Sequence, residues 1–268
     1  ETRHWFRLGR PATPIGSSSA LISWSGSMFE YLMPSLVMRA PAGSVLEQTT
    51  RLIVARQRAY AASLGIPWGI SESAYNARDL EMTYQYSNFG VPGLGLKRGL
   101  SENLVIAPYA TGLAAMVDPV AAVQNYADLA SLGAEGRFGF YEAVDFTPSR
   151  LPSNEPRAIV RSFMAHHQGM TITAIANTLQ GGRLRDLFHA EPMIQGAELL
   201  LQERIPRDVA SALPQAADVL VAPVEPLDAP AVRTFASPAT APPTAHLLSN
   251  GNYGVMLTPT GEGFSRWR

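Results

Sequence analysis

The sequence predicts an all-α fold, a barrel or toroid built from helical hairpins, with a short β hairpin segment at the C-terminus. The first indication is that helical patterns and loops alternate along residues 24–205. The second is that aromatic and acidic residues gather in loops at one end of the helix pairs, where such a barrel builds its site. The third is a change after residue 205 to prolines and then to an alternating segment.

The composition excludes several classes of protein. The 268 residues are 46% hydrophobic and 16% charged, which is enough for a sizeable core in one large domain or two modest ones. A formal net charge of -1 offers no basic field to nucleic acid. The chain has no cysteine, so it has neither disulfides nor thiolate metal sites. We therefore expect no nucleic-acid partner, no metal and no cofactor.

The ends of the chain suggest a part of a longer protein. The first ten residues contain no initiator Met and no apolar signal-peptide core. The last four residues, SRWR, stop inside a patterned segment. The uncharged apolar run at residues 104–117 is too short to span a membrane and contains Pro108. We expect this chain to carry no membrane segment of its own.

The first helical patterns follow a connecting segment at residues 1–23. A helix is expected from Met28 towards residue 40, with Pro34 kinking it. Residues 44–64 form the clearest helix, because Ser44 and a glutamate three residues later make a capping box. Its buried stripe is expected to contain Leu46, Thr50, Ile53, Val54 and Gln57.

A helix-poor stretch follows at residues 68–99. It opens with WGISESAYN, a mixture that fits neither a helical nor a strand period. Its glycines in GVPGLGLKRG, residues 90–99, lack the spacing and the βαβ context of a nucleotide-binding loop, so we interpret them as turns.

The second half of the sequence predicts further helices and then a linker. Helices are expected at 107–117, at 119–132 behind the cap Asp118, and at 183–204 with a break near Pro192. Asn154 is expected to cap a long helix that ends near residue 179. The inner stripe of that helix would contain Ile159, Phe163, His166 and Met170.

Four segments result from this pattern. They are a connecting segment at 1–23, a helical barrel portion at 24–205, a Pro/Ala-rich linker at 206–245 and the start of a β-sandwich domain at 246–268. The last segment alternates around an Asn250-Gly251 turn, which is typical of a hairpin.

Two glutamates lie in aromatic loops of the kind that sugar chemistry needs. Glu72 lies in WGISESAYN, and Glu142 lies in FGFYEAVDF. Cleavage or transfer of a glycosidic bond needs two carboxyl groups, one protonated and one ionised. Sugar recognition adds aromatic faces and polar side chains. Glu30 is the third catalytic candidate, and its alternative role is that of an acid near a helix N-terminus.

The remaining chemical motifs are weaker. His166 and His167 are adjacent on a predicted helix and point in different directions, so a shared metal is less favoured than core or substrate contacts. The sequence contains no GxSxG elbow, which excludes that class of serine hydrolase. Asp145 has the alternative role of a turn acid.

Six blocks in order resemble one known family. They are SGSMFEYLMP, WGISESAYN, GVPGLGLKRG, VIAPYATGLAAM, GRFGFYEAVDFTPSRLP and RSFMAHHQGM. Together they resemble the glucoamylase-like domain of bacterial cyclic β-1,2-glucan synthases, from about Trp24 to Arg204. The C-terminal HLLSNGNYGVMLTPTGEGFSRW resembles the start of the phosphorylase-like domain that follows in those synthases.

The resemblance implies the later part of an (α/α)6 barrel that acts on a β-1,2-glucan chain. In the family, this domain is expected to close the linear chain into a ring by transglycosylation. The implied partners are the glucan and the other domains of the synthase. Together with the lack of cysteine, the resemblance points to the cytoplasmic face of the bacterial inner membrane, within a larger membrane protein. Because an incomplete barrel exposes its core and lacks subsites, we expect the isolated chain to be inactive.

The resulting hypothesis is a retaining transfer with Glu72 as acid/base and Glu142 as nucleophile. Candidate stacking platforms for sugar rings are Trp68, Tyr75, Tyr109 and Tyr141. Candidate partners for substrate hydroxyl groups are Asn76, Arg78, Asp145, His166, His167 and Gln168. Each has a core or surface role as its alternative. An inverting β-1,2-glucanase-type hydrolase and a non-catalytic glucan-holding module are the other functions that the sequence leaves open.

Overall fold

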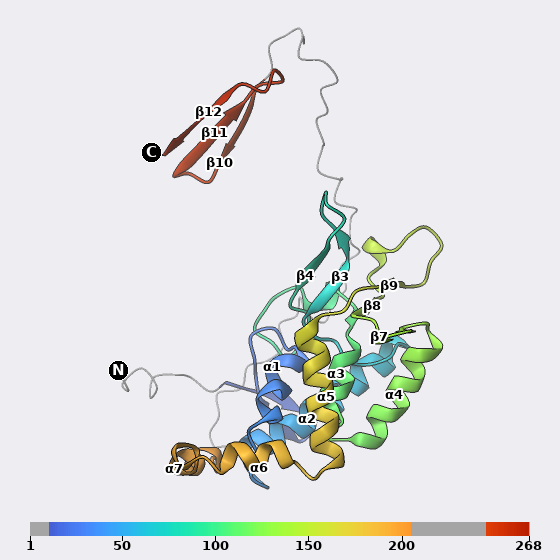
Figure 1. Cartoon of the computed structure of the whole chain (residues 1–268), viewed down its shortest axis with the longest axis vertical. Coiled ribbons are helices and arrows are strands. Elements are labelled where there is room, and N and C mark those ends of the chain that lie inside the picture. The colour runs from blue at the N-terminus through green and yellow to red at the C-terminus, as the bar shows by residue number, and fades with distance from the viewer. Residues whose placement is uncertain (1–10, 205–244, 268) are drawn as a thin grey trace. The chain divides into compact units, whose positions relative to one another are not determined.

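The computed structural model describes residues 11–204 and 245–267 (Figure 1). The chain divides into two compact units, Glu1–Pro223 and Val224–Arg268. The predicted linker at 206–245 lies outside the described residues except for its last residue, as do residues 1–10 of the predicted connecting segment.

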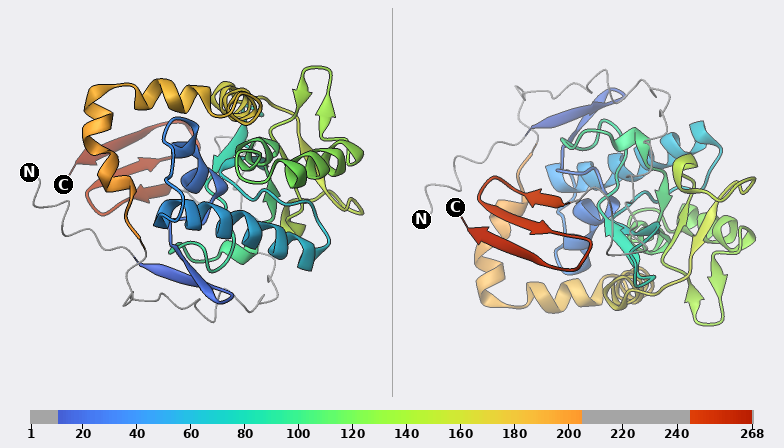
Figure 2. Two further views of the ribbon diagram at one scale, coloured as in Figure 1. Left: turned by 90° about the horizontal axis from the view of Figure 1, so that it is seen from below. Right: turned by 90° about the horizontal axis from the view of Figure 1, so that it is seen from above.

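The first unit is built on a layer of helices. They are α1 (Met28–Leu32), α2 (Val45–Leu64), α3 (Pro108–Ala114), α4 (Pro119–Ser131), α5 (Ala165–Leu179), α6 (Arg183–His189) and α7 (Pro192–Leu201), with 3-10 turns η2 (Met33–Leu36), η3 (Leu100–Glu102) and η4 (Pro148–Arg150). Helix α3 packs on α1, α4 and α5, and α1 packs on α2. Seen from below and from above, α1 and α3 lie between α2 and α5 (Figure 2).

Short antiparallel sheets accompany the helices. The strands of the first unit are β1 (Ala12–Ile15), β2 (Ser18–Leu21), β3 (Ser73–Arg78), β4 (Tyr84–Ser87), β5 (Val105–Ile106), β6 (Glu135–Gly136), β7 (Gly139–Phe140), β8 (Ala143–Asp145) and β9 (Ala158–Val160). They pair as β1-β2, β3-β4, β5-β8-β9 and β6-β7. The second unit is the sheet β10-β11-β12 (His246–Ser249, Tyr253–Leu257 and Gly263–Trp267).

The prediction of an all-α fold is therefore wrong. The described residues contain five small sheets as well as the helices, so the fold is mixed. The long connections between helices carry backbone N–H and C=O groups that need partners once they are buried, and short β-ladders supply them. Val105, Val144 and Val160, one from each strand of β5-β8-β9, are fully buried. The predicted C-terminal hairpin is a three-stranded sheet.

The predicted helix from Asn154 to residue 179 is wrong up to residue 164. Residues 158–160 form β9, in which Val160 pairs with Ala143 of β8, and α5 begins only at Ala165. Asn154 adopts a left-handed backbone conformation with φ 68° and does not cap the helix. Pairing with a strand that lies distant in the sequence therefore overrides the local helical pattern.

Helix ends defined by local signals are confirmed. The Ser44 hydroxyl accepts a hydrogen bond from the Glu47 amide at 3.2 Å at the start of α2. Gly65 ends α2 in the left-handed conformation with φ 66°. The Asp118 carboxylate accepts from the Ala121 amide at 3.0 Å at the start of α4. Pro34 lies at the change from α1 to η2, as the predicted kink requires.

The glycine-rich loop at residues 90–99 consists of turns and bends, as predicted. It packs directly on the backbone before α1. A Cβ atom on Gly90 would lie 1.8 Å from the Ser25 carbonyl oxygen, and one on Gly95 would lie 2.5 Å from the Ser25 carbonyl carbon. These two glycines permit the loop to approach the segment that leads into α1.

The substitution Gly90→Ala is expected to destabilise the chain by about 3 kcal/mol, because a side chain at this position overpacks the backbone of Ser25. The matched control is Gly196→Ala in α7, where an added Cβ meets no atom within 4 Å. Removing a helix-interior glycine there should stabilise by roughly 0.5–1 kcal/mol. Urea denaturation measures both effects, and equal midpoints for the two variants would contradict the predicted close approach.

Candidate active site

The site forms where two strands begin and one helix starts. Glu72 immediately precedes β3, and Glu142 immediately precedes β8. His167 lies in the first turn of α5. In Figure 1, β3, β4, β8 and β9 lie at the same end of α3 and α5. The two loops that the sequence analysis selected therefore meet at one end of the helical layer.

Glu142 is buried, with 2% of its surface exposed. Its Oε1 accepts from the Ala74 amide of β3 at 3.2 Å and lies 2.9 Å from His167 Nδ1. Its Oε2 is buried and has no hydrogen-bond partner within the described part of the chain. One carboxyl oxygen thus joins β3 to α5, while the other has no partner.

The His167 ring is fixed by a stacked tyrosine ring and by contacts at both of its nitrogens. It is fully buried and stacks on the Tyr109 ring of α3, with centroids 3.7 Å apart and an interplanar angle of 14°. Its Nε2 lies 3.3 Å from the Tyr86 hydroxyl of β4. The imidazole therefore connects Glu142 on one side with Tyr86 on the other.

Tyr86 completes a connection between the two glutamates. Its hydroxyl lies 2.9 Å from Glu72 Oε1, to which it donates when that carboxyl is ionised. Glu72, Tyr86, His167 and Glu142 are joined by consecutive hydrogen-bond contacts, and we call them the four-residue network. Glu72 is half-buried and Tyr86 is 39% exposed, so this end of the network faces solvent.

The backbone of Glu72 is held by hydroxyl groups. Its amide donates to Ser27 Oγ at 3.1 Å, and its carbonyl accepts from the Tyr109 hydroxyl at 2.7 Å. Ser71 Oγ lies 2.9 Å from Ser27 Oγ and 2.8 Å from the Tyr109 hydroxyl. Tyr109 therefore supports His167 with its ring and Glu72 with its hydroxyl.

Tyr86 and Tyr109 stay protonated. Burial raises the pKa of Tyr86, and the hydrogen bond to Glu72 raises it further. Burial raises the pKa of Tyr109 well above its ordinary value. For the exposed His166, desolvation lowers the pKa, and the neighbouring His167 adds to that effect.

Asp145 anchors the structure beside the site. It is fully buried, and its oxygens accept from the Asn76 amide at 3.0 Å, from the Thr147 amide at 2.9 Å and from Arg150 Nε at 2.8 Å. The Asn76 side-chain amide donates to the Arg150 carbonyl at 2.6 Å. Asp145 and Asn76, both expected to contact substrate, thus tie β3 to the loop after β8.

Glu30 lies apart from the four-residue network. Both of its carboxyl oxygens accept from the Ser25 amide, at 3.2 and 2.9 Å. It also lines a pocket of about 270 Å³ with Tyr31, Pro34 and Met38, and this pocket contains neither Glu72 nor Glu142. The environment of Glu30 fits its alternative role as an acid in the first turn of α1.

The predicted stacking residues fall into two groups. Trp68 and Tyr109 are buried with 8% and 3% exposure, so both contribute to the core. Tyr75 and Tyr141 are half-buried. The Tyr75 ring packs edge-on against Phe89 at 5.4 Å, and the Tyr141 ring lies 5.3 Å from that of Phe163.

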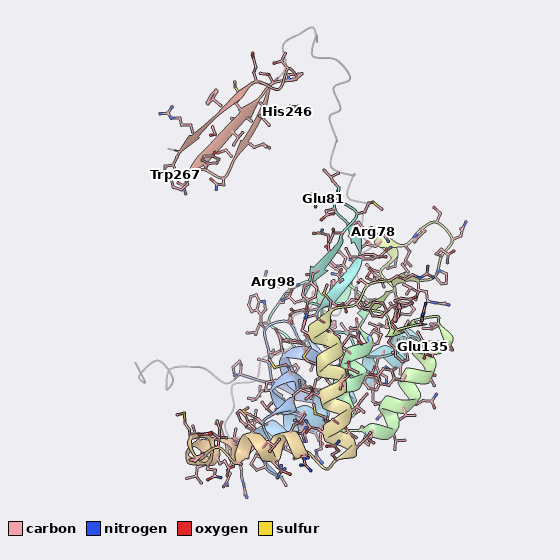
Figure 3. All side chains as sticks on the ribbon, viewed as in Figure 1. Arg78, Glu81, Arg98, Glu135, His246 and Trp267 are labelled. Carbon is pink, nitrogen blue, oxygen red and sulfur yellow. The ribbon has the colours of Figure 1, made fainter. Side chains whose placement is uncertain are left out.

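The residues predicted to bind substrate hydroxyl groups also lie in different environments. His166 is exposed, while the Gln168 side chain donates to the Phe140 carbonyl at 3.4 Å. Arg78 lies near the tip of the β3-β4 hairpin, where its guanidinium covers the Tyr84 ring at 4.3 Å (Figure 3). His167 belongs to the network and is closed off from solvent.

Sequence reasoning missed Tyr86, Ser27, Ser71 and Arg150. Of these four residues, Tyr86 was the easiest to predict from the sequence, because Tyr84 and Tyr86 alternate as in a strand. Tyr86 pairs with Ala74, two residues after Glu72, across the β3-β4 ladder. The contact between Tyr86 and His167 depends on chain segments 81 residues apart. No local signal predicts such a contact.

Residues 11–204 and 245–267 contain no group of three or more His, Cys, Asp or Glu side chains that could hold a metal ion. No helix in the same ranges is long and apolar enough to cross a membrane.

Paired carboxyl groups among tyrosines, at the loop end of a helical layer, are typical of a glycoside-hydrolase-type domain. The chain belongs to the Glycoamylase family, described as "Putative glucoamylase", whose model matches residues 2–192. Residues 228–268 match the supersandwich domain of glycosyl hydrolase 94. Both matches agree with the resemblance found in the sequence.

The chain is 54% identical to the cyclic beta-(1,2)-glucan synthase NdvB of Rhizobium meliloti (strain 1021) over 99% of its length, which confirms the predicted resemblance. The match covers 9% of that relative. Among solved structures, an endo-beta-1,2-glucanase from Chitinophaga pinensis aligns with a TM-score of 0.52 and 17% identity. A "putative glucoamylase" from Bacteroides caccae ATCC 43185 aligns with a TM-score of 0.51 and 20% identity. Each alignment covers 72% of this chain and 46% of the solved one, and shows the fold.

Asp145→Asn is expected to lower the free energy of unfolding by about 3 kcal/mol, since it leaves the Arg150 guanidinium without its buried carboxylate. The matched control is Asp186→Asn, which breaks the exposed ion pair with Arg39 and should cost less than about 1 kcal/mol. Urea denaturation compares the two. Unchanged stability in the Asp145 variant would contradict the anchoring role and favour direct substrate contact.

Proposed function

We propose that this chain forms part of a domain that acts on β-1,2-glucan, transferring or cyclising the linear chain by a retaining mechanism with Glu72 and Glu142. The observation that carries the proposal is the four-residue network, which connects the two carboxyl groups through Tyr86 and His167. The similarity to a cyclic glucan synthase and the fold shared with a β-1,2-glucanase support the choice of substrate.

The environments of the two glutamates support different roles. Glu142 Oε1 accepts from the Ala74 amide and lies within hydrogen-bond distance of His167 Nδ1, an arrangement that stabilises a carboxylate. Its buried Oε2 has no hydrogen-bond partner among the described residues, so we assign the attack to this oxygen. Glu72 faces solvent and shares its Oε1 with a hydroxyl group, which can accept or donate. Glu142 is therefore the nucleophile and Glu72 the acid/base residue.

The reaction then proceeds in two displacements. Glu142 Oε2 attacks the anomeric carbon, the glycosidic C–O bond breaks, and the proton of Glu72 passes to the leaving oxygen. In the second displacement, Glu72 takes the proton from the 2-hydroxyl at the far end of the glucan. That oxygen attacks the anomeric carbon, and the bond to Glu142 breaks. Ring closure results when the attacking hydroxyl belongs to the same glucan chain.

Substrate contacts are proposed for the accessible side chains around the network. Tyr75 and Tyr141 offer partly open aromatic rings, and His166 is exposed beside the buried His167. We also propose that the domain works together with the other domains of a longer synthase, at the cytoplasmic face of the bacterial inner membrane. The relative's much greater length supports this assembly, because this chain corresponds to 9% of it.

The burial of Glu142 supports a second candidate function. With 2% of its surface exposed, Glu142 fits an anchor for His167 as well as a nucleophile. In that case the chain is a glucan-holding module inside the synthase, and the network stabilises its binding surface. Substitution of the two glutamates separates the two functions.

Glu72→Gln and Glu142→Gln in the full-length protein are each expected to lower turnover of linear β-1,2-glucan by roughly 10²–10⁴-fold or more, since each removes a group that acts in the transition state. The control is Glu81→Gln at the exposed hairpin tip (Figure 3), which should leave turnover unchanged. The anomer formed first distinguishes retention from inversion.

Near-normal turnover in the Glu142 variant contradicts its role as nucleophile and makes Glu30 the next candidate. Glucan binding without any product, in the unsubstituted protein, supports the glucan-holding module.

A further inference from the structure

An exposed row of three aromatic rings begins beside Glu142. The Tyr141 ring lies 5.3 Å from the Phe163 ring, and the Phe163 ring lies 6.4 Å from the Phe138 ring, measured between centroids. Phe138 is 74% exposed and Phe163 is 41% exposed, while Tyr141 is half-buried. Single apolar side chains on a surface are common, whereas contiguous exposed ones are typical of a binding surface. We call these three residues the aromatic row.

The hairpin of β6 and β7 presents the outer ring of the aromatic row. Arg137 and Phe138 form the two-residue turn between these strands. Phe140 lies in the same hairpin, but its ring packs against that of Tyr126 on α4, with centroids 4.8 Å apart. The hairpin therefore rests on the helical layer through Phe140, whereas Phe138 stays at the surface.

The inner end of the aromatic row is attached to the candidate active site. Tyr141 directly precedes Glu142 in the chain. The Glu142 amide donates to the Ser162 carbonyl at 3.0 Å, and Phe163 is the next residue. A Cβ atom on Gly136 would lie 2.5 Å from the Tyr141 hydroxyl oxygen, so this glycine lets the ring lie close on the hairpin. The aromatic row thus starts at the proposed nucleophile and leads outwards to the hairpin turn.

Charged and polar side chains border the aromatic row. The Arg137 guanidinium lies 5.3 Å from the centroid of the Phe138 ring. Further exposed neighbours along the chain are Glu135, Arg161 and His166. A pyranose ring has an apolar C–H face and a rim of hydroxyl groups, so it is bound by aromatic side chains with polar groups beside them. The core of a protein interface is instead depleted of charged residues.

We propose that Tyr141, Phe163 and Phe138 form a platform that binds successive glucosyl units of β-1,2-glucan beside Glu142. This inference rests on the proposed function for the identity of the ligand. The rings contact the apolar faces of the sugar units, and Arg137 offers N–H groups to their hydroxyl groups. Because Phe138 lies at the outer end of the aromatic row, it contacts only glucan chains that are long enough to reach the hairpin turn.

Phe138→Ala in the full-length protein is expected to raise KM for long linear β-1,2-glucan by roughly threefold to tenfold with kcat unchanged, since it removes a stacking contact made equally in the ground state and the transition state. KM for the shortest β-1,2-linked oligosaccharide that is turned over should change less. Phe138 is largely exposed, so its truncation leaves the interior packing intact. The matched control is Val123→Ala, which shortens a 71% exposed apolar side chain of α4 and should leave KM unchanged.

Two further substitutions distinguish a sugar platform from an apolar contact with another protein domain. Phe138→Trp keeps a flat aromatic face and should retain the KM of the unsubstituted protein. Phe138→Leu keeps apolar surface but loses the ring, so it should resemble Phe138→Ala. A contact with another domain of the synthase depends on apolar area, and in that case Phe138→Leu behaves like the unsubstituted protein, which overturns the platform.

A binding measurement separates the platform from the proposed function. Isothermal titration calorimetry of linear β-1,2-glucan uses the full-length Glu72→Gln protein, in which turnover is stopped. Adding Phe138→Ala to this protein should raise Kd by the same roughly threefold to tenfold.

Equal Kd values with and without the Phe138 ring overturn the platform, as does a KM change of the same size for short and long glucans. If the unsubstituted full-length protein forms no product from β-1,2-glucan while Phe138→Ala still weakens glucan binding, the proposed function fails and the platform stands. Normal turnover together with an unchanged KM in Phe138→Ala has the opposite meaning.

Discussion

The arrangement of the site depends on one buried carboxyl oxygen, Glu142 Oε1. It accepts a hydrogen bond from the Ala74 amide of β3 and lies within hydrogen-bond distance of His167 on α5. The residue itself precedes β8, so three segments distant in sequence meet at one atom. A buried carboxylate is stable only when donors surround it. That requirement fixes the start of β3, the orientation of the His167 ring and, through that ring, the place of Tyr86.

The small sheets are what make this meeting possible. Helices α3 and α5 pack together, and β3, β4, β8 and β9 lie at one of their ends. The β3-β4 ladder brings Tyr86 opposite Ala74, and β5-β8-β9 fixes the residues that follow Glu142. Asp145 and Arg150 then fasten β3 to the loop behind β8 through a buried ion pair and backbone amides. The helical layer supplies the core, whereas the ladders determine where the polar side chains converge.

Local signals in the sequence predicted most of the helices, but not the contacts between segments. Ser44 and Asp118 cap helices through atoms three residues away, so the sequence alone reveals them. Asn154 failed as a cap because β9 is stabilised by pairing with β8, an interaction that no local window contains. Glu72 and Glu142 were recognisable from their polar, aromatic loops. Their connection through Tyr86 depends on tertiary packing, as does the burial of Trp68.

Tyr109 couples the position of the Glu72 carboxyl group to that of the Glu142 carboxyl group. Its ring supports His167, which holds Glu142, while its hydroxyl supports the backbone of Glu72. A side chain with a different ring or a different polar tip would therefore disturb both arms of the site together. Glu72 can be retuned by itself through Ser27, whose hydroxyl contacts the Glu72 amide, by natural divergence or by protein engineering. The contact of Ala74 with Glu142 is made by a backbone amide, so exchanging the Ala74 side chain leaves that hydrogen bond in place.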